Sequence, residues 1–474
     1  MFANVVDPLV WRDRDGGFVP GLAESWGVAD EGRTYRFSLR RGVSFHDGTP
    51  LTAEVVRASF DRIADPATHS QAAKDMLGPY AGTELVGEHE LVVRLTEPFA
   101  PFLDAVSQAW LAPVSLPAVH VLGDRFGQVP VGTGPFKVVR HDERELVLKA
   151  NPEYRWAPPH LGHQGPPYLA SVVFSYVPEA TARVAALRSG AIHGFYEFAT
   201  GDLGLIAGDG GITPRVDPIP GVPVGMMMNT GRLPTSDAAV RRAITRSLDV
   251  PELVRRVFGS LVKPATAPLA STTAGYQPFF GADVPADGAS AQALLDRAGW
   301  APGADGIRVR AGARLSLVFC ALPHAGYARI GEEVARQLRP LGVEVEVRVL
   351  PIGEWLAAGD AGTHHLIPVG KFAYEPDVLE MIYHSRHVGH GYAWSWCRDD
   401  RLDAMLTDAV RTLDPARRKE LFTAIQSRIV ELALVVPLHE NVCVTVLRAE
   451  VTGFAVDLRS YPLLYDVRLA TAVA

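Results

Sequence analysis

Two carboxylates in the sequence could carry acid–base chemistry. Glu197 stands in "GFYEFATGD" (194–202), and Glu375 stands in "VGKFAYEPDVLEMIYHS" (369–385). A carboxylate held in a closed site can act as a general acid or base. Lys371 could instead hold an acidic group of a ligand. Solvent-facing positions would also explain Glu375 and Lys371, so their chemistry depends on the elements that position them.

Three histidines lie close together in "YHSRHVGHGYAWSW" (383–396). His384, His387 and His390 could bind a transition metal, because imidazole is a common ligand of such ions. Two glycines mark this segment as a loop, however, and no cysteine or carboxylate stands in register with the imidazoles. We therefore predict a polar loop with no metal, and no other cofactor.

Aromatic and thioether side chains could form the walls of a ligand pocket. Tyr392 and Trp394 could stack on a flat ligand. The further candidates for the pocket lining are Tyr196, Phe198, Met226, Met227, Met228 and Tyr374. The methionines, Tyr196 and Phe198 could equally belong to a hydrophobic core, where such residues are common.

The sequence holds no catalytic motif. There is no G-x-S-x-G, no H-E-x-x-H, no P-loop and no G-x-G-x-x-G that opens a helix. The cysteines at 320, 397 and 443 are widely separated, and we expect Cys320 and Cys443 to be buried, inert thiols. Pattern alone therefore predicts no enzyme.

Composition narrows the class of partner. The chain has 474 residues, of which 47% are hydrophobic and 21% charged, as in an ordinary globular protein of two or three domains. A formal net charge of -7 offers no basic surface for nucleic acid. Apolar runs such as "LALVVPL" (432–438) are too short to span a membrane. We expect a monomer that binds a small molecule, without nucleic acid or membrane insertion.

Strands and helices alternate along most of the chain. Residues 136–151 predict two strands that turn at Asp142 and Glu143, and residues 173–196 predict a strand, a helix and a second strand in a parallel sheet. Residues 313–350 repeat this strand-helix-strand order. In "LDPARRKELFTAIQSRIVEL" (413–432), Asp414 is the expected helix N-cap. Two mixed cores joined by strand crossovers would enclose a cleft.

Several ordered segments resemble a known family. They are "GFVPGLAESWGVADEGRTYRFSLRRGVSFHDGTPLTAEVVRASFDRI" (17–63), "VGTGPFKV" (131–138), "NPEYRW" (151–156), "VPEATARVAALRSGAI" (177–192), "MNTGRLPTSDAAVRRAI" (228–244), "WSWCRDDRLDAML" (394–406) and "VVPLHENVCVTVLRAEVTGF" (435–454). The chain resembles the extracellular solute-binding proteins of family 5, which are the dipeptide, oligopeptide and nickel-binding receptors of ABC importers. Most of these motif residues have a structural role, so they indicate fold and not substrate.

The resemblance implies an α/β fold. It is the bilobed periplasmic-binding-protein clamshell (type II, cluster C), with an extra domain inserted in the first lobe and the ligand held between the lobes. Mapped by the motifs, the first lobe comprises residues 1-20, 131-225 and 446-474. The inserted domain is 21-130, and the second lobe is 226-445.

The segment before Pro376 carries information about the ligand. In peptide-binding members of the family, it holds an Asp that pairs with the free ammonium of the peptide. Here Ala373 or Tyr374 stands at that place, and a buried ammonium needs a nearby anion. We therefore expect a small polar or amphipathic ligand that is not a standard peptide with a free N-terminus, although Glu375 could replace the Asp. Lys371 favours an acidic group in the ligand.

Two functions remain open at this stage. One is a receptor that presents its ligand to an ABC permease. The other is a cytosolic enzyme of specialised metabolism that uses the same fold for a condensation or cyclisation of the Pictet-Spengler kind. The clamshell would supply positioning and exclude water, and Glu197 or Glu375 would supply one proton transfer. The upstream DNA and the neighbouring genes would discriminate between them.

The beginning of the sequence bears on location. The first 25 residues include charged side chains and no sustained apolar stretch, so they do not form a signal peptide. The segment "NVVDPLV" (4–10) follows a first strand in relatives, and no such strand precedes it here. As the sequence stands we expect a cytoplasmic protein, and an extracytoplasmic one if an export segment precedes Met1.

Overall fold

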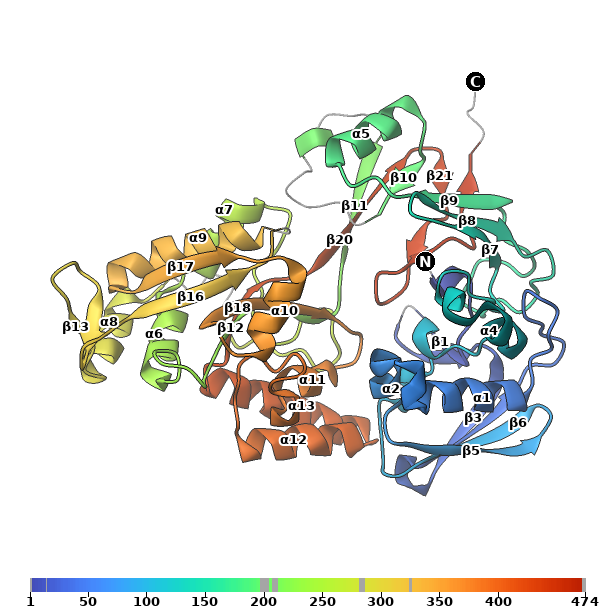
Figure 1. Cartoon of the computed structure of the whole chain (residues 1–474), viewed down its shortest axis with the longest axis horizontal. Coiled ribbons are helices and arrows are strands. Elements are labelled where there is room, and N and C mark those ends of the chain that lie inside the picture. The colour runs from blue at the N-terminus through green and yellow to red at the C-terminus, as the bar shows by residue number, and fades with distance from the viewer. Residues whose placement is uncertain are drawn as a thin grey trace.

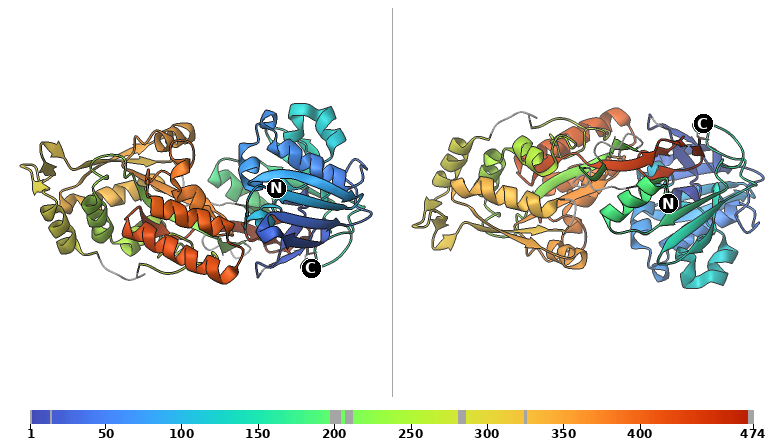
Figure 2. Two further views of the ribbon diagram at one scale, coloured as in Figure 1. Left: turned by 90° about the horizontal axis from the view of Figure 1, so that it is seen from below. Right: turned by 90° about the horizontal axis from the view of Figure 1, so that it is seen from above.

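Two α/β lobes joined by long strands make up the molecule (Figure 1). This computed structural model describes residues 2–13, 15–196, 204–206, 212–280, 286–323 and 326–470. Both views in Figure 2 show the two bodies side by side, with the N-terminal elements in one and the yellow and orange elements in the other. The predicted bilobed α/β class is confirmed.

A five-stranded sheet forms the centre of the second lobe. Its strand order is β17 (Glu344–Val349), β16 (Ser316–Ala321), β18 (Leu366–Phe372), β12 (Gly221–Met228) and β19 (Val435–His439). β16 and β17 are parallel and are connected through α9 (Tyr327–Leu338), which confirms the strand-helix-strand prediction for 313–350. β12 is buried along its whole length, because helices cover both faces of this sheet.

Other helices and a small sheet complete the second lobe. The helices are α6 (Ala238–Ser247), α7 (Val250–Phe258), α8 (Gly288–Arg297), α10 (Ile352–Asp360), α11 (Val378–Tyr383), α12 (Asp400–Arg411) and α13 (Pro415–Glu431). The three short strands β13 (Ala301–Pro302), β14 (Arg308–Arg310) and β15 (Ala313–Arg314) form a separate sheet. The predicted N-cap is confirmed, because the Asp414 side chain accepts a hydrogen bond of 2.7 Å from the Arg417 N–H.

The first lobe is built on small antiparallel sheets. β7 (Phe136–His141), β8 (Glu145–Ala150) and β9 (Ser171–Ser175) form one of them, and β7 and β8 are the hairpin predicted for 136–151. β10 (Gly194–Phe195), β20 (Val442–Arg448) and β11 (Ile212–Pro218) form another, next to α5 (Ala180–Ser189).

The parallel sheet predicted for 173–196 is wrong. A strand, a helix and a second strand do follow one another, but β9 pairs antiparallel with β8, whereas β10 pairs antiparallel with β20 in a different sheet. Local sequence predicts the elements, but the partner of β10 comes from the C-terminal part of the chain. Tertiary pairing therefore determined a topology that local order could not predict.

A four-stranded antiparallel sheet lies beside these first-lobe sheets. Its order is β3 (Ala23–Ala29), β4 (Thr34–Leu39), β6 (Glu90–Leu95) and β5 (Tyr80–Gly87). The helices of this part are α1 (Ala53–Ala64), α2 (Gln71–Leu77), α3 (Phe102–Ala105) and α4 (Leu116–Leu122). α1 buries Val56 and Phe60 in the same core as Phe37 of β4. The domain boundaries predicted from the motifs stay a prediction.

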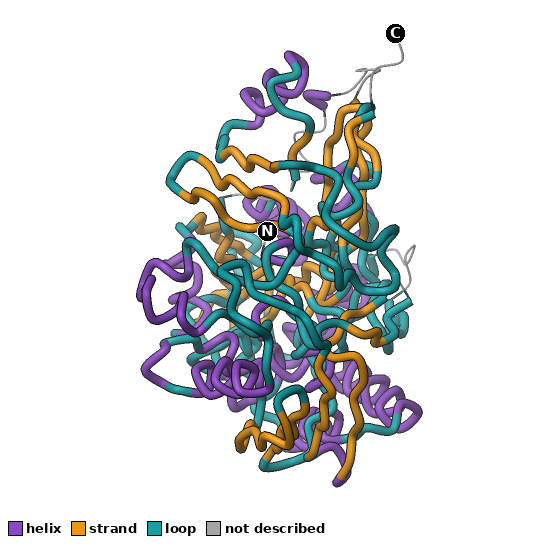
Figure 3. Tube along the Cα trace, turned by 90° about the vertical axis from the view of Figure 1, so that its right-hand side faces the viewer, coloured by secondary structure: helices purple, strands orange, loops and turns teal. Residues whose placement is uncertain are grey.

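Short pairings tie the chain ends to the first lobe. β1 (Val10–Arg12) pairs with β2 (Phe18–Pro20), β21 (Val451–Thr452) with β24 (Arg468–Leu469), and β22 (Ala455–Val456) with β23 (Pro462–Leu463). Figure 3, which faces the first-lobe end, shows the N-terminal end of the trace in the middle of that face.

Several of the family-like segments meet at one buried carboxylate. Asp7 is 1% exposed and accepts hydrogen bonds from Thr133 (2.9 Å), Tyr154 (3.1 Å) and Trp156 (3.0 Å). Burial raises the pKa of Asp7 to about 6, although the three hydrogen bonds and Arg40 act to lower it. The motif residues around Asp7 therefore hold the first lobe together.

Two strand crossovers connect the lobes. β11 leads into β12, and β19 leads into β20, so that both crossovers run side by side (Figure 1). The Ile219 N–H donates to the Asn441 carbonyl over 2.9 Å, and the Asn441 amide donates to the Val222 carbonyl over 3.0 Å. These bonds join the two crossovers into one connection between the lobes.

Candidate ligand-binding site

Arg12 reaches from the first lobe toward the second. It is the last residue of β1 and lies opposite Phe18 in the short β1–β2 pair, with its guanidinium 4.0 Å from the centre of the Phe18 ring. Asp13 holds the turn that follows by accepting hydrogen bonds from the backbone of Asp15 and Gly17. Local turn chemistry therefore fixes the backbone from which Arg12 projects.

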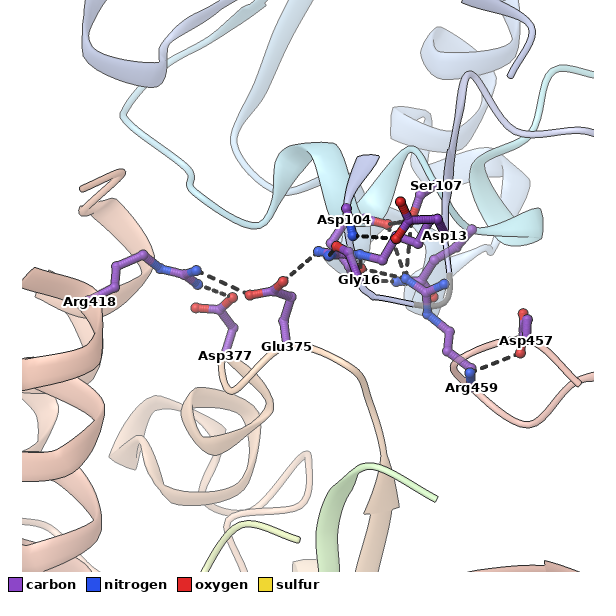
Figure 4. A network of polar contacts seen from close by, with 12 residues as sticks. Asp13, Gly16, Asp104, Ser107, Glu375, Asp377, Arg418, Asp457 and Arg459 are labelled. Atoms are coloured by element: carbon purple, nitrogen blue, oxygen red, sulfur yellow. Dashed lines mark hydrogen bonds and ion pairs between the residues drawn. The ribbon is translucent and has the colours of Figure 1, made fainter. Parts of the chain in front are cut away.

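The guanidinium of Arg12 has three acceptors from different parts of the chain. Its Nε donates to Asp104 Oδ1 over 2.7 Å, its Nη1 to the Gly16 carbonyl over 2.5 Å, and its Nη2 to Glu375 Oε1 over 2.5 Å. Glu375 belongs to the second lobe, so this last bond spans the gap between the lobes (Figure 4). The Arg12 and Glu375 side chains are only 6% and 16% exposed.

The second-lobe side of this contact is the loop that joins β18 to α11. Glu375 also accepts from Arg418 of α13 over 3.1 Å, and Arg418 donates to Asp377 over 2.5 Å. The ring of Tyr374 lies under Arg12, with its centre 4.6 Å from the guanidinium carbon. Residue 16 has a φ of +83°, which favours glycine, and an added Cβ would overlap the Tyr374 hydroxyl, so the tyrosine ring would have to move.

The charged side chains around Arg12 and Glu375 are poorly hydrated, and their positive and negative charges are closely balanced. Burial and the nearby Glu375 raise the pKa of Asp377 to about 7, although Arg418 opposes the shift. Arg459 continues the network in the first lobe by donating to Asp104 Oδ1 over 2.5 Å. We name the connected side chains Arg12, Asp104, Glu375, Asp377, Arg418 and Arg459 the interlobe network (Figure 4).

A small pocket adjoins the interlobe network in the first lobe. Trp11, Gln108, Arg459 and Tyr461 are among its lining residues, and its volume is about 10 Å³. This volume admits about one water molecule. A larger solute would therefore need the lobes or the lining to move apart.

Lys371 lies near the same loop in a partly apolar setting. Its ammonium is 4.7 Å from the centre of the Tyr392 ring, and burial lowers its pKa. Within the described ranges, no carboxylate forms an ion pair with Lys371. Lys371 and Tyr392, both named from the sequence, are thus brought together. Tyr196 is half-buried and donates its hydroxyl to the Ser460 carbonyl in the first lobe.

Other candidates lie in the core of the second lobe. Met227 is 1% exposed, and Met226 and Met228 are 0% exposed, because β12 is a central strand with helices on both faces. Trp394 is 1% exposed, packs edge-on against Trp355 and donates to Asp360 over 2.9 Å. The three methionines therefore lie in the core, which was the alternative stated for them, and Trp394 is buried in the same lobe. The remaining candidates, Glu197 and Phe198, fall outside the described residues.

The histidine loop has partners within the protein. His384 lies 3.4 Å from Asp403, and His387 lies 3.0 Å from Glu380. In the part of the chain that the structure describes, no group of three His, Cys, Asp or Glu side chains is placed to hold a metal ion. These imidazoles therefore contact carboxylates of neighbouring helices.

Sequence reasoning missed Arg12, Asp104, Asp377, Arg418 and Arg459. Arg459 lies 355 positions from Asp104, and the types and spacing of these residues match no local motif. Only Glu375 of the interlobe network was a candidate, and it was found because it stands beside Pro376. The fold, and not a sequence pattern, brings the other members together.

The fold and the site together define a class. Two α/β lobes, a paired crossover between them and polar side chains that meet across the gap are typical of hinged solute-binding proteins. The model of "Bacterial extracellular solute-binding proteins, family 5 Middle" matches residues 17–393. The chain belongs to family 5 of the bacterial extracellular solute-binding proteins. Among the described residues, no helix is long and apolar enough to cross a bilayer.

Individual relatives differ in what their names say they bind. The chain is 26% identical over 455 residues to the glutathione-binding protein GsiB of Escherichia coli (strain K12), and the match covers 91% of this chain and 82% of the relative. NikA from Brucella suis, solved in complex with Fe(III)-EDTA, has a TM-score of 0.85 at 23% identity, covering 99% of this chain and 94% of NikA. DppA from Helicobacter pylori, solved with the peptide STSA, has a TM-score of 0.81 at 23% identity, with coverages of 99% and 93%. The two structures support the fold.

Proposed function

We propose that this protein captures a small polar or amphipathic solute between its two lobes and presents it to an ABC permease outside the cytoplasm. Members of family 5 bind small ligands and work with ABC importers. The observation that carries the proposal is the interlobe contact between Arg12 and Glu375, because it places polar, poorly hydrated side chains of both lobes at one interface. Family membership gives the enzyme alternative no support.

The charge pattern favours a ligand with an acidic group and without a free N-terminal ammonium. Glu375 is already paired with Arg12 and Arg418, so it has no uncompensated charge to offer an ammonium. Lys371, by contrast, forms no ion pair with any described carboxylate. An acidic group of the ligand would satisfy the Lys371 ammonium. Tyr374 and Tyr392 would provide flat surfaces for the remainder of the ligand.

Paired probes test this preference. Thermal unfolding is followed with N-acetyl-Ala-Glu and with Ala-Glu, and then with glutathione, the ligand in the name of the relative GsiB. We expect N-acetyl-Ala-Glu to raise the midpoint more than Ala-Glu, because a ligand stabilises the folded state that it binds. Lys371→Met should abolish that shift, whereas Lys74→Met, at a distant exposed lysine, should retain it. An equal or larger shift with Ala-Glu would overturn the proposed preference.

A further inference from the structure

We propose that the Arg12 guanidinium is a built-in cation that pairs with the Glu375 carboxylate and latches the two lobes together when no ligand is bound. The same ion pair keeps cationic groups of a ligand away from Glu375. The latch is independent of the proposed function, whereas the exclusion of cations rests on it. Among the ion pairs of the described residues, Arg12–Glu375 is the only one that joins the two lobes through mostly buried side chains.

The surroundings of Arg12 fit a guanidinium closely. Each of its three nitrogens has an acceptor, on Asp104, Gly16 and Glu375. Phe18 at 4.0 Å and Tyr374 at 4.6 Å contact it through their rings. Acceptors and rings together form a preorganised site for a planar cation, and both lobes contribute to that site.

Charge balance explains why a cation must stay beside the Glu375 carboxylate. The interlobe network contains three cationic side chains and three carboxyl groups: Arg12, Arg418 and Arg459 against Asp104, Glu375 and Asp377. Without Arg12, two carboxyl groups in the second lobe would share Arg418 alone. A poorly hydrated carboxylate that loses its partner is strongly disfavoured, so the site would then take up another cation or a proton.

A second ion pair provides a matched control. Arg411 of α12 pairs with Glu97, which follows β6. This pair also joins the second lobe to the part of the molecule that contains the first lobe and the β3–β4–β6–β5 sheet. Its side chains are 47% and 45% exposed, whereas those of Arg12 and Glu375 are 6% and 16% exposed. Exposed pairs contribute little, so burial should separate the effects of the two pairs.

Small-angle X-ray scattering of the ligand-free protein tests the latch. We expect Arg12→Ala to lower the ratio of closed to open molecules by about tenfold or more, since a hydrogen bond between charged groups is lost. The radius of gyration should rise accordingly. Arg411→Ala should change the ratio by no more than about fivefold, as an exposed pair allows. An Arg12→Ala protein that is as compact as wild type would overturn the proposal.

Chemical rescue tests the site itself. Millimolar methylguanidinium should return Arg12→Ala to the compact form and leave wild type unchanged. Glu375→Gln should open the protein as well, but methylguanidinium should not close it, because the carboxylate is gone. Rescue of both variants, or of neither, would contradict a cation site at Glu375. If Arg12→Ala fails to fold, as judged by circular dichroism, Arg12→Gln takes its place. No solute is added, so the scattering and rescue results report on the latch, whereas the thermal-unfolding probes with added solutes report on ligand capture.

Discussion

Replacement of Asp7 by asparagine should change how stability depends on pH. Burial raises the pKa of this carboxyl from 3.8 to about 6 in the folded protein, so the folded state favours its protonated form. Below about pH 4 the group is protonated in both states, and the favourable contribution is complete. As the pH rises through about 6, the contribution is lost, because the ionised group is better hydrated in the unfolded chain.

The magnitude follows from the two pKa values. A rise from 3.8 to about 6 corresponds to about 3 kcal/mol of unfolding free energy. An asparagine side chain does not titrate, so the stability of Asp7→Asn relative to wild type should increase by about 3 kcal/mol between about pH 4 and pH 7. The amide also places a donor toward Thr133 or Trp156, but that cost of about 1–3 kcal/mol is the same at every pH.

Urea unfolding across this pH range measures the difference. At each pH, the unfolding free energy is measured for wild type, for Asp7→Asn and for the control Asp124→Asn, which changes an exposed aspartate. The quantity compared is the difference in unfolding free energy between each variant and wild type. The control should follow wild type. If the curves of Asp7→Asn and wild type stay parallel from about pH 4 to pH 7, Asp7 does not carry the raised pKa and the reasoning is refuted.

Two further substitutions test the fold. Met227→Ala should lower the unfolding free energy by about 2–5 kcal/mol in urea, because it leaves a cavity in the second-lobe core; a loss below about 1 kcal/mol would instead favour a pocket-lining position. Asp414→Ala should cost about 1 kcal/mol in the same assay, because the Arg417 N–H loses its cap. The nearby Lys419→Ala, on the same helix, should be close to neutral, and an equal loss there would count against the cap.

Much of the fold follows from local sequence. The β16–α9–β17 unit and the α13 cap were predictable, because apolar periodicity and capping residues act within a few positions. The partner of β10 was not predictable, since β20 lies about 250 residues away. The same limit applies to the site. Lys371 and Tyr392 were named from residue type, but Met227 and Trp394 look alike in sequence whether they line a pocket or fill a core.

Arg12 is a residue whose role could not be predicted from the sequence. In the sequence it is one of several charged residues in "WRDRDGG" (11–17), and nothing there distinguishes it from a solvated arginine. Its role depends on Asp104 and Glu375, which lie 92 and 363 positions away. Because the role of Arg12 depends on partners far away in the sequence, only the folded structure shows that role.

Native mass spectrometry of the purified protein tests the central claim most directly. We expect a population heavier than the chain by the mass of one small solute, which is released when the protein is denatured. The released solute should carry an acidic group and bind again to the ligand-free protein in a one-to-one ratio. A protein that carries no solute, and to which neither N-acetyl-Ala-Glu, Ala-Glu nor glutathione binds, would contradict a solute-capturing role.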